Sequence, residues 1–79
     1  MTRTKYIVIE DENIIIFPET LVHKEVADKF GNVIRAGFCQ IFTDGSDIIY
    51  HCFGRSDSLN LESDVEMDSY LLQNLFERR

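Results

Sequence analysis

Two apolar runs separated by a short polar segment open the chain and predict a β-hairpin. Residues 5–10 are rich in β-branched and aromatic side chains, which favour strands. The polar segment at residues 11–13 is turn-forming, and Ile14–Phe17 resumes the extended pattern. Pro18 should end the second strand, because proline cannot donate a hydrogen bond to a strand ladder.

The apolar residues that follow this hairpin are spaced as in a helix. A short helix is expected from a capping residue at Thr20 to about Lys29, before Gly31 and Asn32 interrupt the pattern. Its apolar positions fall on one side of the helix. They are Leu21, Val22, Val26 and Phe30.

A second hairpin is predicted from strands at Val33–Phe42 and Asp47–Phe53. Asp44 and Gly45 between them tolerate the positive φ of a type I′ turn. With those two residues as the loop, the facing pairs are Phe42 with Asp47, Ile41 with Ile48, Cys39 with Tyr50 and Phe38 with His51. A three-residue loop would shift this register.

Strand alternation sorts this hairpin into two faces. The first face carries Ile34, Ala36, Phe38, Gln40, Phe42, Ile49, His51 and Phe53, and we take it as the core face. The second carries Val33, Arg35, Gly37, Cys39, Ile41, Ile48, Tyr50 and Cys52. It is not polar enough to be plainly solvated, so a further layer is expected to cover it.

A polar loop at residues 54–60 precedes a final helix. Ser63 and Glu66 have the spacing of a capping box, and Arg78 and Arg79 suit the opposite end of the helix dipole. The predicted apolar stripe consists of Met67, Leu71, Leu72, Leu75 and Phe76. The expected architecture is a single α+β domain over residues 1–79. Its order is β-β-α-β-β-α, with a mostly antiparallel four-stranded sheet and helices packed on one face.

Composition and charge narrow the possible partners. The 79 residues carry a net charge of −6, divided as −1 over residues 1–40 and −5 over residues 41–79. Phosphate binding needs clustered Lys and Arg, so direct nucleic-acid binding is not expected, whereas a basic protein surface would be attracted. No stretch approaches the roughly 20 apolar residues of a membrane span, and no secretory signal is recognisable. We therefore expect a cytoplasmic protein with two reduced cysteines.

Four side chains raise the possibility of cysteine–histidine chemistry: Cys39, Cys52, His23 and His51. In the register above, His51 lies on the opposite face from both cysteines, which favours two buried thiols and no catalytic pair. The cysteines share a face diagonally, about 7–8 Å apart, which is poor geometry for a disulfide. The chain is therefore expected not to be an enzyme.

Two sets of side chains could be considered for a metal ion. One is His23, Glu19 and Glu25, and the other is Glu62, Asp64, Glu66 and Asp68. The second set lacks the alternating ligands and central glycine of a calcium loop. Helix capping and solvation explain both sets, so no metal or other cofactor is expected.

The loop after the second hairpin is the best candidate for a small ligand. Arg55, Ser56 and Ser58 could together hold a phosphate or carboxylate, with the guanidinium supplying two parallel hydrogen bonds. The second glycine and the lysine of a phosphate-binding loop are missing. The alternative is a turn whose hydroxyls satisfy their own backbone.

Ile14–Phe17 is apolar on both sides, so both sides of this strand require cover. A chain of this length has material for about one core layer, and the second layer is either a second copy or a roof from the same chain. A homodimer is expected from the first alternative. Its interface would use Ile14, Ile16, Ile41, Ile48 and Tyr50.

Three segments resemble small uncharacterised proteins encoded by phages and bacteria. They are Gly37-Phe38, the run from Cys52 to Leu59, and Asp68 followed by Leu71-Leu72, all in the C-terminal half. The resemblance implies a mobile-element protein and no particular activity. Short acidic phage-encoded chains often bind and block a host protein, as anti-CRISPR and other counter-defence proteins do. The expected function is therefore protein–protein contact, with anion or nucleotide binding at the Arg55 loop as the alternative.

Overall fold

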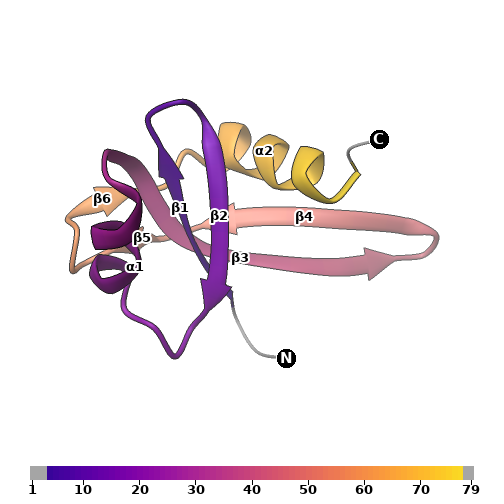
Figure 1. Ribbon diagram of the computed structural model, residues 1–79. Coiled ribbons are helices and arrows are strands. Elements are labelled where there is room, and N and C mark those ends of the chain that lie inside the picture. The colour runs from indigo at the N-terminus through magenta and orange to yellow at the C-terminus, as the bar shows by residue number, and fades with distance from the viewer. Residues whose placement is uncertain (1–3, 78–79) are drawn as a thin grey trace.

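A computed structural model describes residues 4–77 and confirms the α+β fold with its four-stranded antiparallel sheet (Figure 1). The sheet has the order β2-β1-β3-β4 and consists of β1 (Thr4–Ile9), β2 (Asn13–Pro18), β3 (Val33–Asp44) and β4 (Asp47–Phe53). The helices are α1 (His23–Phe30) and α2 (Val65–Glu77). A second, two-stranded sheet that the sequence did not predict consists of β5 (Arg55–Ser56) and β6 (Leu61–Glu62).

The two helices pack on opposite faces of the main sheet, so the expectation that both lie on one face is wrong. Tyr6 and Val8 of β1 pack in a cluster with Leu72 of α2. Ile7, between them, packs in another cluster with Val26 of α1. Because β1 is a central strand with apolar side chains on both faces, each face needs its own cover.

The second hairpin has the expected strands but a different turn. Asp44 pairs with Asp47, so the loop consists of Gly45 and Ser46. Gly45 has φ +67°, and glycine at the first loop position is the pattern of a type II′ turn. The register therefore differs by two residues from the expected one, and Ile41 faces Tyr50. A shift of two leaves every side chain on its predicted face.

The cap residue of each helix lies one or two positions later in the chain than the sequence predicted. A turn closed by the Leu21 amide and the Pro18 carbonyl contains Thr20, and α1 starts after Val22. In α2 the cap is Asp64 rather than Ser63, because Asp64 Oδ1 accepts the Met67 amide at 3.1 Å. The Ser63 hydroxyl instead donates to the Gly54 carbonyl at 2.7 Å.

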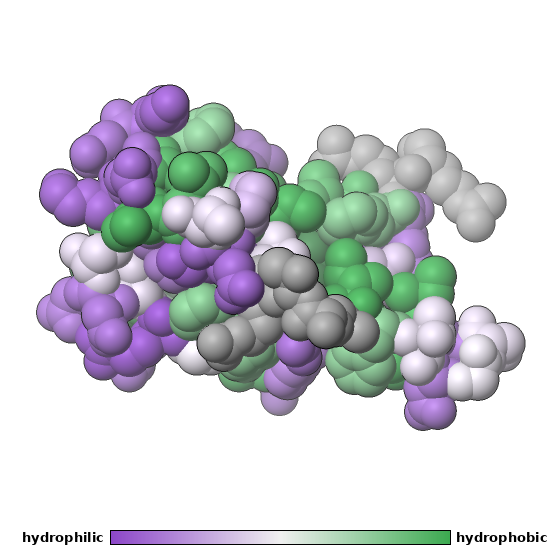
Figure 2. All heavy atoms as spheres, turned by 90° about the horizontal axis from the view of Figure 1, so that it is seen from below, coloured by the Kyte–Doolittle hydropathy of each residue, from purple (hydrophilic) through white to green (hydrophobic). Residues whose placement is uncertain are grey.

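The β3–β4 hairpin projects beyond the rest of the sheet. β3 has 12 residues and β1 has six, and over the described residues the pairing between these two strands runs as far as Cys39. Residues 40–51, here called the hairpin arm, therefore extend to one side of the molecule (Figure 1). Figure 2 shows hydrophobic atoms gathered along this arm, with a more polar tip.

Candidate functional site

Asp68 is the centre of a buried polar network that joins four parts of the fold. The carboxylate is fully buried, and it accepts the Tyr6 hydroxyl at 2.5 Å and Arg35 Nε at 2.6 Å. It also accepts the Asp64 amide at 3.0 Å, which adds to the capping of α2. Arg35 reaches further, to Glu12 in the β1–β2 turn at 2.6 Å. The network thus connects α2 with β1, β3 and that turn.

The electrostatics of this network hold Tyr6 and Arg35 each in one protonation state. Burial raises the pKa of Tyr6, and the neighbouring Asp68 carboxylate raises it further. Burial by itself would lower the pKa of Arg35, but hydrogen bonds to Glu12 and Asp68 outweigh it and the net shift is upward. Tyr6 therefore stays neutral and Arg35 stays charged at physiological pH.

The hydrogen bonds of this network can stabilise the fold, but its polar groups are already engaged within the protein. Every buried side-chain polar atom in the described part of the chain has a hydrogen-bond partner. Asp68 already accepts three hydrogen bonds, so a substrate would have to displace a protein group to reach it. A buried carboxylate with paired cations and donors stabilises one packing of the elements around it.

The sequence contained a signal for this network in the position of Asp68. It was overlooked because the predicted apolar stripe counted only hydrophobic residues. Asp68 stands four residues before Leu72, so both point to the same side of α2, and both are fully buried. Three of the residues assigned to the stripe are instead largely exposed, namely Met67, Leu75 and Phe76. The available clue was a charged residue at helical spacing from a buried leucine. Arg35 and Tyr6 also share one face of the sheet.

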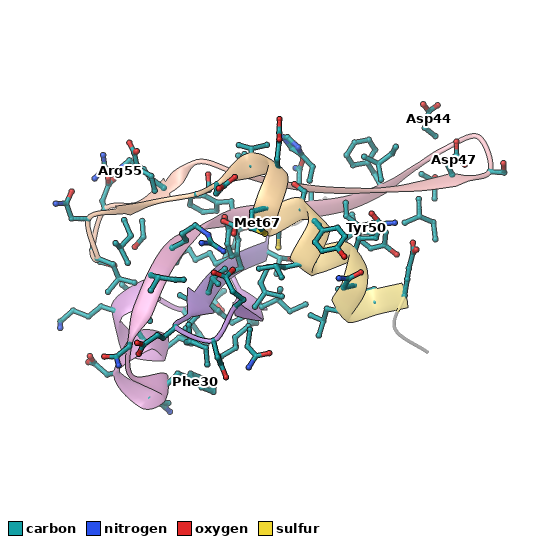
Figure 3. The ribbon with its side chains drawn as sticks, turned by 90° about the horizontal axis from the view of Figure 1, so that it is seen from above. Phe30, Asp44, Asp47, Tyr50, Arg55 and Met67 are labelled. Carbon is teal, nitrogen blue, oxygen red and sulfur yellow. The ribbon has the colours of Figure 1, made fainter. Side chains whose placement is uncertain are left out.

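Arg55, the residue predicted to hold an anion, is surrounded by acceptors of its own loop. Its guanidinium donates to Asn60 Oδ1 at 2.6 Å and lies 3.2 Å from Asp57 and 3.9 Å from Glu62. An anion at this position would have to compete with two carboxylates. Arg55 lies at the opposite end of the molecule from the tip of the hairpin arm (Figure 3).

The two serines of the same loop satisfy each other and the backbone. Ser56 is buried, and its hydroxyl oxygen accepts the Leu59 amide at 3.3 Å. Ser56 Oγ and Ser58 Oγ are also 3.3 Å apart. These contacts match the alternative in which the loop hydroxyls complete a turn. Ligand binding at this loop stays a prediction.

The two cysteines lie on one face of the main sheet, and both histidines lie on its other side. Cys39 and Cys52 are free, buried and directly opposite each other, so their expected diagonal placement is wrong. Burial raises the pKa of Cys39 to about 11 and that of Cys52 to about 12, which keeps both thiols protonated near neutral pH. His51 lies on the other face, stacked on Phe53.

His23 is buried at the start of α1, with edge-on contacts to Phe17 and Phe38. Its Nε2 lies 2.8 Å from the Gly37 carbonyl and donates a hydrogen bond to it. Burial lowers the pKa of His23. Within residues 4–77, no three His, Cys, Asp or Glu side chains are grouped so that they could hold a metal ion.

The residues expected at a dimer interface share the face of the sheet that α2 covers, where Ile14 belongs to the core cluster and Ile16 and Tyr50 pack against it. Ile14 is buried and Ile16 half-buried in β2, at one edge of the sheet. Ile41, Ile48 and Tyr50 belong to the hairpin arm at the other side, with β1 and the base of β3 between the two groups. Tyr50 is half-buried, with its ring stacked on Phe76 at 6.1 Å, beside α2 (Figure 3).

Comparisons of the chain with family models, with curated proteins and with solved structures found no match. The resemblance to phage-encoded proteins therefore stays a prediction. No helix within the described residues has the length and apolar character needed to span a bilayer.

Proposed function

We propose that the chain is a protein-binding module and that the hairpin arm is its binding element. The observation that carries this proposal is the apolar surface of the arm. Ile41, Phe42, Ile48 and Ile49 are 37, 39, 52 and 36% exposed. They lie on both faces of a two-stranded projection that no other described strand extends.

The energetics favour a partner that encloses the arm. A two-stranded hairpin is marginally stable by itself, so an arm without a third strand gains order when a partner packs on it. Completing the burial of these four side chains would contribute about 1 kcal/mol each, roughly half the value for a fully exposed aliphatic or aromatic side chain. Exposed apolar side chains on both faces of such a projection are typical of a binding surface.

The charge of the arm indicates the chemistry of the partner. Asp44 and Asp47 face each other at the exposed tip, where like charges repel. The chain as a whole carries −6. The partner that fits is an apolar cleft with Lys and Arg at its rim, and clustered Lys and Arg are a feature of nucleic-acid-binding proteins. Occupying such a surface would make the chain an inhibitor, as the analogy of size and charge with short acidic counter-defence proteins suggests.

The same proposal assigns no catalytic activity to the chain and places it in the cytoplasm. Two protonated, buried thiols on adjacent strands fit a reducing compartment. The polar groups that were candidates for chemistry, at Asp68 and at Arg55, are engaged within the fold.

The test compares capture by the immobilised wild-type chain with capture by Ile48→Asp. Tyr70→Asp is the matched control, because Tyr70 is exposed to 60% but lies on α2. Wild type and Tyr70→Asp should retain the same protein from a host lysate, and Ile48→Asp should lose it. Retention of the same proteins by all three would contradict the proposal. A change of mass in solution caused by Ile48→Asp would instead assign the arm to self-association.

A further inference from the structure

The outer edge of β2 is an unprotected strand edge. β2 is the terminal strand of the sheet, so alternate residues direct their backbone N–H and C=O groups outward. Natural edge strands are usually protected by charged residues, prolines or bulges. Ile14–Phe17 has none of these, and Pro18 is the last residue of the strand.

The opposite edge of the sheet differs from β2 in this respect. The Cys52 amide of β4 donates to Ser69 Oγ of α2 at 2.9 Å, and β4 carries Asp47 and His51. A strand approaching β4 would therefore meet a helix and a charged tip. Among the described residues, the β2 edge carries no such hydrogen bond from a helix, so we take it as the edge that accepts an added strand.

An apolar groove of about 320 Å³ lies beside this open edge. Ile15 and Phe17 of β2 line it on one side, and Leu21, Val26 and Phe30 line it on the side of α1. A strand added to β2 would place its alternate side chains in this groove, and the intervening ones would continue the face covered by α2.

We propose that the strand added here is β2 of a second copy of the chain, antiparallel to the first, so that two four-stranded sheets join into one. An apolar strand that is exposed along its edge is complementary to itself under a twofold axis. This inference concerns a different surface from the hairpin arm and does not depend on the partner of the arm.

The charges along the groove support a second copy as the occupant. Glu25 lies in the first turn of α1 and Lys29 in the last, and both line the groove. Across the described residues, Lys29 has no ion pair or hydrogen bond. Phe30 and Asp11 line a common hollow, so the Lys29 end of α1 lies near the β1–β2 turn. Antiparallel pairing would place this end beside the Glu25 end of the other copy.

The dimer would leave both arms free. Because β2 and β4 are opposite edges of the sheet, joining two copies at β2 points their hairpin arms away from each other. The assembly would be bivalent, and simultaneous engagement of two partner sites raises the effective affinity without any new contact.

The test is the mass of the full chain by light scattering, combined with hydrogen exchange, at protein concentrations of about 1 to 100 μM. The wild type should dimerise, and the amides of residues 13–18 should become better protected as concentration rises. Ile15→Lys should raise the dissociation constant about 30-fold or more, because it places an unpaired charge in the interface. Ile48→Lys, on the arm, is the matched control and should leave the dimer unchanged.

Two results would overturn the inference. One is a wild-type chain that stays monomeric over the whole concentration range. The other is a dimer whose residues 13–18 gain no protection with concentration and whose mass responds to Ile48→Lys but not to Ile15→Lys. Because hydrogen exchange is measured on the wild type, the test holds even where Ile15→Lys unfolds the chain.

Discussion

Asp68 is a single side chain on which the packing of α2 depends. It is fully buried and receives hydrogen bonds from Tyr6, Arg35 and the Asp64 backbone. Removing one partner from a buried charged network leaves the others without compensation, which is more harmful than replacing the whole network by apolar groups. The residue is thus expected to matter far more to stability than its exposed neighbours on the same helix.

Replacing the carboxylate tests this directly. Asp68→Ala should lower the free energy of unfolding by about 3 kcal/mol, because Arg35 and the Tyr6 hydroxyl lose their partner in the interior. Glu66→Ala, two residues earlier and on the exposed side of the helix, should change it by about 0.5 kcal/mol. Urea unfolding measures both. A loss of under about 1 kcal/mol for Asp68→Ala would show that the network contributes little.

His23 gives the fold a dependence on pH. Its pKa is lowered by burial, so the unfolded chain takes up the proton first as pH falls below the ordinary value of 6.5. The stability contributed by neutral His23 is therefore complete above that pH and declines as acidity increases. Unfolding measured at several pH values should show this decline, and His23→Gln should flatten it. An equal flattening by His51→Gln, on an exposed histidine, would contradict the assignment to His23.

Gly37 of β3 lies very close to the backbone of β4 and to the ring of Tyr6 in β1. A Cβ atom added there would lie 2.5 Å from the Phe53 carbonyl oxygen and 3.3 Å from the Tyr6 ring. The backbone oxygen cannot move without disturbing the pairing of β3 with β4. The absence of a side chain at this position is therefore required by packing rather than by backbone conformation.

Gly37→Ala should lower the free energy of unfolding by about 3 kcal/mol through overpacking. Gly45→Ala provides the comparison, because Gly45 has open space around it and its positive φ costs about 1 kcal/mol with a side chain present. Thermal unfolding of the two variants ranks them. If Gly45→Ala were the more harmful substitution, the close approach at Gly37 would not limit stability.

The sequence predicted the four strands of the main sheet, the helices and the two faces of the second hairpin because these follow from local periodicity. It misplaced the turn by one residue, since Gly45 suits either of two turn types and the choice changes the register by two. It placed both helices on one face because periodicity shows which side of a helix is apolar but not which face of a sheet it covers. The apolar residues of β1, on both of its sides, were the evidence that two covers were needed.

The candidate site was less predictable than the fold. Arg55 and its serines are neighbours in sequence, so they attracted attention as a ligand loop, but their acceptors come from the same loop. The Asp68 network joins residues separated by as many as 62 positions, and only the folded sheet brings them together. The spacing of Asp68 and Leu72 indicates that Asp68 lies on the buried side of α2, but it does not indicate which distant residues pair with it.

The whole molecule leaves two surfaces uncovered for different reasons. α1 and α2 cover the two faces of the central strands, so the apolar residues of β1 need no second chain. The tip of the hairpin arm projects beyond α2 (Figure 1), whose Phe76 stacks on Tyr50 nearer the base of the arm, and the edge of β2 lies beside the groove that α1 lines. We assign the first surface to a basic partner protein and the second to another copy of the chain.

The central claim is that the arm contacts another protein, and photo-crosslinking in cells tests it most directly. Ile48 is replaced by a benzoyl-phenylalanine, with the same replacement at Tyr70 on α2 as the reference position. A crosslinked product of defined mass is expected from position 48 and none from position 70. No crosslink from position 48, or the same products from both positions, would contradict the claim.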